Sequence, residues 1–321
     1  MARESPPLHA WLMLAAAVLA VSSAGPVFQL IDEVQPLLRA SWRLQLTAIF
    51  LAPLAVWQYR GMDAQTRERT RTPKVTGIIV GSGLCLWIHF GSWVWSLDHT
   101  SLTHSLLFVT AHPLVFVAGL WLLKRPTNRQ QTLGAVLGFL GAAVVLMGIG
   151  SEGDVTFAGD AAAFLGAVAI VGYLTAGRVL REWMPLFVYA FPVTLIAAFM
   201  LGLSAVWMEG AAWGTIPAAS AVLGWSSLVW LPYIAYLALG PGMVGHTGIN
   251  AVLRWFPPLV ISVAVVLEPL IGSLIGWVLG TTGVPGMWTW LGGPLLIAGV
   301  LLVSMGLDEL NTDAQAAASE E

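Results

Sequence analysis

The chain has 321 residues, of which 57% are apolar and only 10% are charged, whereas roughly a quarter of the residues in an average soluble domain are charged. This composition excludes an ordinary soluble enzyme, and the apolar residues suffice for roughly nine or ten membrane-spanning helices. The net charge of −3 offers no basic surface for nucleic acid. The single cysteine, Cys85, can form neither an internal disulfide nor a cysteine metal site, and we expect neither a metal nor a cofactor.

Apolar stretches separated by short polar segments predict an all-α membrane protein with ten transmembrane helices. The first stretch resembles the apolar region of a signal peptide, but we interpret it as an uncleaved span because nine more follow it. The eighth is interrupted by Gly240-Pro241-Gly242, so residues 220–240 could also be counted as a span of their own. The ten stretches lie at residues 9–30, 36–58, 75–97, 102–123, 132–150, 159–178, 184–207, 226–253, 259–280 and 288–307.

The basic residues are distributed as the positive-inside rule requires for ten spans. With both termini on the cytoplasmic side, the inner segments hold 12 of the 14 lysines and arginines, at residues 3, 60–74, 124–129, 178–181 and 254. We therefore expect a multi-pass protein of the cell (plasma) membrane with two cytoplasmic termini. The outer segments carry acidic residues instead, namely Asp32, Glu33, Asp98, Glu152, Asp154, Asp160 and Glu209.

An internal repeat relates the fourth and fifth spans to the ninth and tenth. His112-Pro113 and Glu268-Pro269 are 156 residues apart, and three glycines of the fifth span match three of the tenth at a separation of 158. Their spacing of seven residues gives each helix one face of small residues, which allows close packing in lipid. The matched glycines are Gly134, Gly141 and Gly148 in the first copy and Gly292, Gly299 and Gly306 in the second.

A repeat unit of five spans must insert its second copy upside down, because five is odd. The sequence thus predicts two inverted five-helix repeats, at residues 8–150 and 159–307, followed by a disordered acidic tail at residues 308–321. Inverted repeats are common in secondary transporters, whose substrate sites lie near the bilayer midplane beside broken helices.

Several stretches together resemble the EamA-type transporters of the drug/metabolite transporter superfamily, over roughly residues 8–307. They are PLLRASWRLQLTAIFLAP in the second span, AHPLVFVAGLWLLKRPTNRQQTLGAVLGFLGAAVVLMG in the first copy, GDAAAFLGAVAIVGYLTAGRVL in the sixth span, and VLEPLIGSLIGWVLG with LGGPLLIAGVLLVSMG in the second copy. The resemblance implies an exporter of small polar metabolites built from two EamA-like repeats. Lys124 and Gly280 stand where the family usually has a glutamate, so the role of those glutamates cannot be assumed here.

Ionisable residues at membrane depth are expensive and mark candidate functional sites. Glu268 lies in the middle of the ninth span, where it could exchange protons or meet a cationic substrate group, or stay neutral as a hydrogen-bonded packing residue. His112 occupies the equivalent place in the first repeat, so pseudo-symmetry predicts that both line one central cavity. The proline that follows each of them frees a backbone carbonyl and predicts a helix break.

Arg43 lies seven residues past Pro36, about 10 Å below the outer surface by helical rise. It matches an arginine typical of the family's second span, and it could bind a substrate carboxylate or pair with Asp32 or Glu33. Arg39, one turn earlier, can extend outward to the interface.

Further polar and aromatic residues could line the same cavity, although structural roles are simpler for most of them. We expect Trp93 and Trp95 to anchor the outer membrane interface, and Asn250 and His246 to satisfy backbone groups freed in a broken helix. The predicted substrate-binding residues are Arg43, His89, His112, Tyr173, Asn250 and Glu268, and the other candidates are His104, Tyr189 and Trp87.

The leading hypothesis is a secondary carrier that exports a small polar metabolite, such as an amino acid, by alternating access, with protons as a candidate coupling ion. No Walker-type loop supports ATP drive, and no metalloprotease or hydrolase motif supports an enzyme. The alternative is a channel or receptor-like protein without transport activity. The expected partners are a small-molecule substrate and the lipid bilayer, in a monomer or homodimer.

Overall fold

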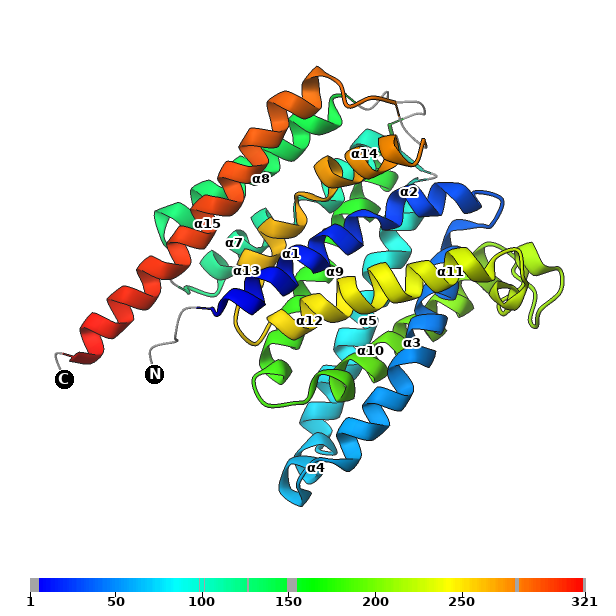
Figure 1. The fold of residues 1–321 in the computed structure, drawn as a ribbon, viewed down its shortest axis with the longest axis horizontal. Helices are drawn as coiled ribbons and strands as arrows, with labels where there is room; N and C mark the ends of the chain where they lie inside the picture. The colour runs from blue at the N-terminus through cyan, green and yellow to red at the C-terminus, as the bar shows by residue number, and fades with distance from the viewer. Residues whose placement is uncertain are drawn as a thin grey trace.

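The computed structural model describes residues 6–97, 99–100, 102–125, 127–148, 155–280 and 283–319, and Asp98, Glu152 and Asp154 of the predicted outer segments lie outside it. In this part of the chain the structure is helical, apart from one isolated bridge between Ala212 and Ala221 (Figure 1). The α-helices are α1 (Leu8–Ser22), α2 (Ala24–Phe28), α3 (Pro36–Arg60), α4 (Ala64–Thr70), α5 (Pro73–Leu97), α6 (Leu102–Val109), α7 (His112–Leu122), α8 (Arg129–Leu146), α9 (Phe157–Arg181), α10 (Leu186–Met208), α11 (Leu231–Leu237), α12 (Gly248–Val252), α13 (Pro258–Val265), α14 (Glu268–Val278) and α15 (Met287–Ser319).

Eight helical runs among the described residues are long and apolar enough to cross a membrane. The chain is thus an integral multi-pass membrane protein. The two other predicted spans, the second and the eighth, correspond to α3 and to the run Leu231–Val252. The first of these carries Arg39 and Arg43, and the second is divided into α11, the π-helix η4 (Ala238–Thr247) and α12. Helix α11 starts at Leu231 rather than at residue 226, because Gly224–Ser226 forms a separate 3-10 turn.

The two proline-linked breaks lie where the sequence predicts them. Residues Thr110 and Ala111 separate α6 from α7, which begins at His112, and Val266 and Leu267 separate α13 from α14, which begins at Glu268. Both α7 and α14 have a proline in their first turn. The N–H groups of a first turn have no partner within the helix, so the N–H that proline lacks costs no helical hydrogen bond. Both breaks thus begin a new helix with an ionisable residue.

The matched glycines of the sequence repeat meet in one interface between α8 and α15, which lie side by side in Figure 1. Gly134 faces Gly299, and Gly141 faces Gly292, so the two helices run antiparallel. A Cβ atom added at Gly299 would lie only 2.6 Å from the backbone nitrogen of Gly138. The backbones therefore touch directly, which maximises dispersion contact where lipid offers no hydrophobic drive for association.

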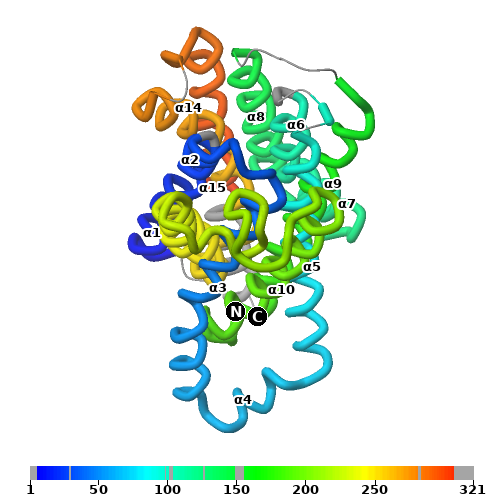
Figure 2. The backbone as a smooth tube through the Cα atoms, turned by 90° about the vertical axis from the view of Figure 1, so that its right-hand side faces the viewer, coloured from blue at the N-terminus to red at the C-terminus, as the bar shows by residue number. Residues whose placement is uncertain are grey.

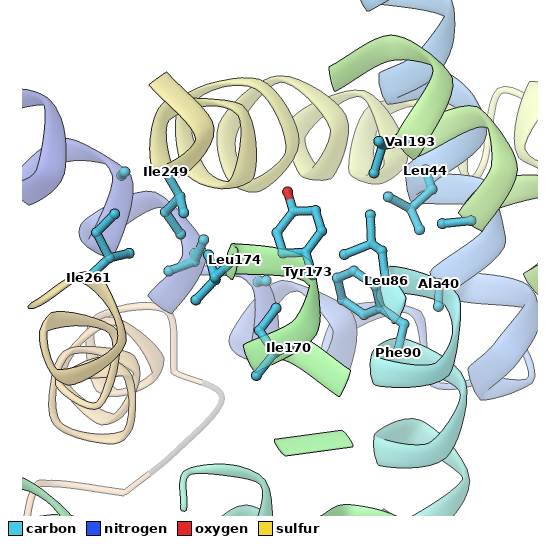
Figure 3. Close-up of a cluster of buried hydrophobic side chains, with 14 of the residues drawn as sticks. Ala40, Leu44, Leu86, Phe90, Ile170, Tyr173, Leu174, Val193, Ile249 and Ile261 are labelled. Atoms are coloured by element: carbon cyan, nitrogen blue, oxygen red, sulfur yellow. The ribbon is translucent and has the colours of Figure 1, made fainter. Parts of the chain in front are cut away.

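The remaining long helices pack around a core of apolar side chains that range from alanine to tryptophan. Helices α5 and α10 both contact α3 and each other, α9 packs along α5, and α1 lies against η4 and α12 (Figure 2). Figure 3 shows part of the buried cluster where α9 meets α5, with Ile170 and Tyr173 beside Leu86 and Phe90. This arrangement brings α3, α5, α9 and η4 to one central point.

The basic loop at residues 60–74 and the C-terminal segment are both helical in part. Helix α4, which projects at one end of the molecule (Figure 1), belongs to the basic loop at residues 60–74, and the Asp63 carboxylate caps it by accepting from Thr66 N at 2.8 Å. Hydrogen bonds from Thr66 hold the pKa of this exposed carboxyl below its usual value. At the C-terminus, α15 continues to Ser319, into residues for which the sequence predicts disorder. Its alanine-rich final turns favour a helix once α15 has nucleated it.

The glycine interface generates the first prediction. Gly299→Ala should lower the free energy of unfolding by about 1–3 kcal/mol, because the new methyl group forces the backbones of α8 and α15 apart. The measurement is the thermal unfolding midpoint in detergent. Gly81→Ala on α5 is the matched control, since nothing lies within 4 Å of its Cβ position, and its midpoint should stay or rise. Equal midpoints for Gly299→Ala and wild type would contradict this packing.

Candidate functional site

A cavity of about 80 Å³ lies at the central meeting point of the helices, and it is large enough to hold water. Its walls come from segments far apart in the sequence, and both proline-linked breaks contribute to it. Five of the six predicted substrate-binding residues line it, and the sixth, Asn250, is hydrogen-bonded to one of the five. The lining side chains with polar groups are Arg43, His89, Trp93, Thr110, His112, Tyr173, His246, Ser262 and Glu268.

Arg43 is a buried cation with unused hydrogen-bonding capacity. Its side chain is only 3% exposed, and Nη2 donates to the carbonyl of Pro241 in η4 at 3.2 Å. Its guanidinium carbon lies 5.3 Å from the centre of the Phe90 ring, a distance typical of a cation–π contact. Its Nε has no hydrogen-bond partner among the described residues. The arrangement leaves a donor available for a negatively charged or carbonyl-bearing ligand.

Glu268 supplies the opposite charge from the start of α14. Its carboxylate lines the cavity, and it forms neither a hydrogen bond nor an ion pair with any residue of the described chain. The positive end of the α14 dipole stabilises a carboxylate at this position. Arg43 and Glu268 interact electrostatically without direct contact, so the cavity separates a cation from an anion.

Three histidines surround this pair, each held differently. His112 Nδ1 lies 2.5 Å from Ser262 Oγ on α13, and His89 Nδ1 donates to the Gly166 carbonyl of α9 at 2.9 Å. His246 Nδ1 has no partner within the described part of the chain. His112 and Glu268 both line the cavity, as the repeat predicts, yet His112 bonds to the hydroxyl of Ser262 rather than to the carboxylate.

Tyr173 and Asn250 form a second polar edge. Asn250 Nδ2 donates to the Tyr173 hydroxyl at 2.7 Å, while Asn250 Oδ1 has no partner in the described residues. Asn250 lies on α12, just after the π-helix. Its side chain was predicted to satisfy freed backbone groups, but it instead donates to a side chain of α9. The pair joins the interrupted helix to the cavity wall.

Two residues that line the cavity, Trp93 and Ser262, were not predicted to do so. Trp93, expected at the membrane interface, lines the cavity and stacks on His89 with ring centres 6.3 Å apart. The helical spacing of four between His89 and Trp93 was the available signal. Ser262 lies in an apolar run, Leu259–Ala264, and only the three-dimensional contact with His112 distinguishes it.

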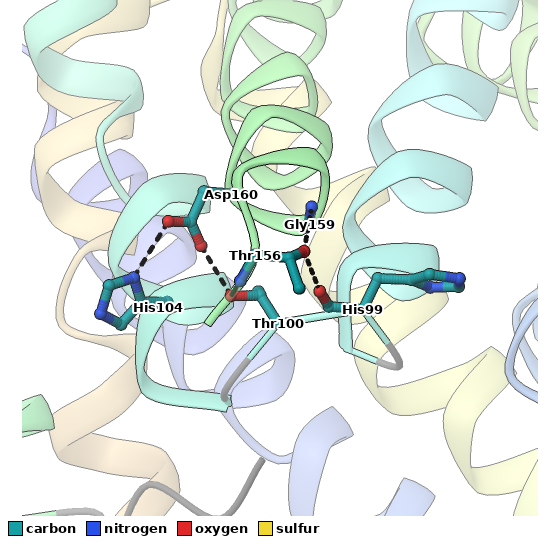
Figure 4. Close-up of polar contacts among 6 residues, drawn as sticks. All are labelled: His99, Thr100, His104, Thr156, Gly159 and Asp160. Atoms are coloured by element: carbon teal, nitrogen blue, oxygen red, sulfur yellow. Dashed lines mark hydrogen bonds and ion pairs between the residues drawn. The ribbon is translucent and has the colours of Figure 1, made fainter. Parts of the chain in front are cut away.

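Other candidates lie away from the cavity. Trp87 donates to Ser204 at 3.0 Å, Tyr189 bonds to Ser82 at 2.6 Å, and Trp95 stacks on His99. His104 Nδ1 is 3.1 Å from Asp160, whose carboxylate also accepts from Thr100 at 2.7 Å (Figure 4). This cluster ties the α5–α6 connection to the start of α9. In the described residues no group of three His, Cys, Asp or Glu side chains has the arrangement of a metal site.

Comparison with known proteins agrees with this architecture. Residues 8–147 match the sequence profile of the EamA-like transporter family. This match covers the first of the two repeats predicted from the sequence. Because EamA-like proteins are membrane transporters, the match indicates that this part of the chain is related to membrane transporters.

Structural comparison shows a likeness in fold over almost the whole chain. A solved structure titled only "Crystal structure of protein" superposes with a TM-score of 0.75 at 18% sequence identity, covering 95% of this chain and 99% of the other. A search of curated proteins gives no significant sequence match.

The contact between His112 and Ser262 generates the second prediction. Ser262→Ala should lower the free energy of unfolding by about 1–3 kcal/mol, because it leaves a buried imidazole nitrogen without its partner. Thermal unfolding in detergent measures it. Ser304→Ala removes a hydroxyl bonded only to Val300 one turn earlier in α15, and this control should shift the free energy by about 0.5 kcal/mol or less. Identical midpoints for both variants would argue against the contact.

Proposed function

We propose that the protein is a secondary carrier, not driven by ATP, that exports a small polar metabolite such as an amino acid by alternating access. The observation that carries the proposal is the central cavity, in which Arg43 and Glu268 face one space without neutralising each other directly. A zwitterionic substrate matches this separation of charges, since its anionic group can bind Arg43 and its cationic group Glu268. Aromatic walls at Phe90 and Trp93 suit an apolar portion of the substrate.

Helix breaks beside the cavity support the carrier mechanism. Discontinuous helices in transporters expose backbone groups and dipole ends to substrate near the midplane. Here α7 and α14 both begin beside the cavity, and the carbonyl of Pro241 in the π-helix η4 already bonds to Arg43. Substrate that takes over the hydrogen bonds of Arg43 would free this carbonyl and alter the packing of η4, which couples occupancy to helix position.

The proposed architecture is ten spans in two inverted five-helix repeats, residues 8–150 and 159–307. The antiparallel pairing of Gly134 with Gly299 and of Gly141 with Gly292 supports it, because equivalent helices that meet at a two-fold axis in the membrane plane run in opposite directions. Rocking of one repeat against the other would open the cavity to each side in turn. The basic inner segments support cytoplasmic termini in the cell membrane.

Proton coupling is the proposed energy source, with Glu268 as the proton-carrying group. Its carboxylate has no hydrogen-bond partner among the described residues, and Glu268 lines the cavity together with His112 and His246. Protonation of Glu268 removes the charge that attracts a cationic group and so changes affinity for the substrate. The alternative, a channel or receptor-like protein, requires a continuous polar path or an external ligand site, whereas the cavity is small and lined mainly by bulky side chains.

Transport itself is tested with purified protein in liposomes. We expect saturable, protein-dependent flux of at least one compound from a panel of amino acids, nucleobases and phosphorylated metabolites. Substrate loaded on the opposite side should accelerate uptake, because a carrier returns faster when occupied and a channel does not. Protein-free liposomes are the control. The absence of flux across the panel, or flux without such acceleration, would count against the carrier.

Glu268→Gln tests the coupling ion. This variant should lose substrate accumulation driven by a pH gradient and keep substrate exchange. Glutamine preserves the shape of the side chain, but its amide neither gains nor releases a proton at the pH of the experiment. The measurement is labelled-substrate uptake with and without the gradient. Asp63→Asn, which alters an exposed carboxylate outside the cavity, should keep both activities. Gradient-driven accumulation by Glu268→Gln equal to that of wild type would exclude the proton role.

A further inference from the structure

A second polar pocket, of about 350 Å³, lies where the membrane helix α9 ends and α10 begins. It is formed by the α9–α10 connection, the C-terminal end of α3 and the α12–α13 connection, and it shares no lining residue with the central cavity. Its lining residues are Gln58, Arg181, Glu182, Trp183, Met184, Pro185, Leu186, Ala251, Arg254 and Trp255. We call it the α9–α10 pocket.

Two arginines give this pocket an excess of positive charge. Arg181 is 7% exposed, and its guanidinium and that of Arg254 repel each other. Neither pairs with a carboxylate anywhere in the described chain. Glu182 also lines the pocket, but it lies 3.9 Å from Arg178, which offsets its charge. Burying one guanidinium beside another without an anion is unfavourable, so the pocket lacks a negative partner.

Hydrogen-bond donors remain available in the α9–α10 pocket. A guanidinium has five N–H groups. Arg181 donates from Nε to the Asn250 carbonyl at 3.0 Å and from Nη1 to the Met184 carbonyl, and its Nη2 has no hydrogen-bond partner among the described residues. Helix α10 begins at the pocket, and its N-cap residue, Pro185, makes no side-chain cap. Of the backbone N–H groups in its first turn, that of Phe187 donates to Gln58 Oε1 at 2.7 Å. The positive end of the α10 dipole would attract an anion bound in the pocket.

The position of the pocket selects the kind of anion. The membrane helix Phe157–Arg181 ends at it and the next, Leu186–Met208, begins there, which places it at the level of the lipid phosphates. Trp183 and Trp255 border it, as aromatic side chains do at membrane interfaces, and Arg69 lies over the Trp183 ring at 3.9 Å, adding a third cation nearby. Trp57, one residue before Gln58, is 69% exposed and faces outward from the bundle.

We propose that the α9–α10 pocket binds the phosphate group of an anionic phospholipid, held by Arg181, Arg254 and the start of α10. Basic pockets between membrane helices bind lipid head groups in this way. The bound phosphate would neutralise the repulsion between the two arginines. It would also fasten the ends of α3, α9 and α12 to one another at the membrane surface. This inference requires a membrane-embedded chain and is independent of the carrier proposal.

Native mass spectrometry of the purified full chain tests the proposal. The protein is taken from nanodiscs of phosphatidylcholine with and without phosphatidylglycerol, and lipid retention is titrated. Wild type should retain one phosphatidylglycerol in preference to phosphatidylcholine. Arg254→Gln should bind it about tenfold more weakly, the change expected from losing one charge-assisted hydrogen bond. Arg254→Lys, which keeps the charge, should retain most of the binding.

Two controls make the outcome decisive. Arg125→Gln removes an exposed basic residue from the α7–α8 connection, outside the pocket, and should retain phosphatidylglycerol like wild type. Equal loss in Arg125→Gln, or retention unaffected by Arg254→Gln, would overturn the proposal. Inorganic phosphate added to phosphatidylcholine nanodiscs distinguishes the source of the anion: thermal stabilisation by free phosphate without preferential retention of phosphatidylglycerol would overturn the lipid assignment. None of these measurements depends on transport.

Discussion

Hydrocarbon cannot satisfy backbone hydrogen bonds, and the whole architecture follows from this constraint. Long helices satisfy their own N–H and C=O groups, so the chain interrupts them only where protein or a polar cavity replaces the lost partners. The breaks before His112 and Glu268 and the π-helix η4 all lie at the central cavity. Irregular backbone and intramembrane charge are therefore concentrated in the same small volume.

Close packing of small residues makes that concentration possible. Direct backbone contact of Gly134 and Gly141 with α15 fixes two antiparallel helices without large side chains. At the cavity itself, Gly166 lets α9 approach α5 closely enough for its carbonyl to accept the hydrogen bond of His89. Gly166 thus positions one cavity wall, and the bulkier Phe90, Trp93 and Tyr173 shape the interior.

Most of the polar residues that line the cavity could be predicted from the sequence, because intramembrane charges and helix-breaking prolines are rare and conspicuous. Arg43, Glu268 and His112 could be identified from depth and pseudo-symmetry alone. Their hydrogen-bond partners could not be identified from the sequence. Ser262 lies in an apolar helix, and both Ser262 and the Pro241 carbonyl become recognisable as partners only when distant segments of the chain meet. Trp93 was misassigned because a tryptophan near the end of a span serves equally well as an interface anchor or as a cavity wall. Helix α3 is not among the eight apolar runs. It carries Arg39 and Arg43, which donate to backbone carbonyls of the protein.

Arg181 connects the two polar regions of the molecule. Its Nε holds the backbone carbonyl of Asn250, whose side chain holds the Tyr173 hydroxyl in the cavity. Movement of α12 relative to α9 must therefore stretch both hydrogen bonds or shift Arg181 with it. A phosphate held by Arg181 would resist such a shift, because the guanidinium would have to leave its anion or carry it along. Arg181 thus links the binding of an anion at the membrane surface to the geometry of the cavity wall through two hydrogen bonds.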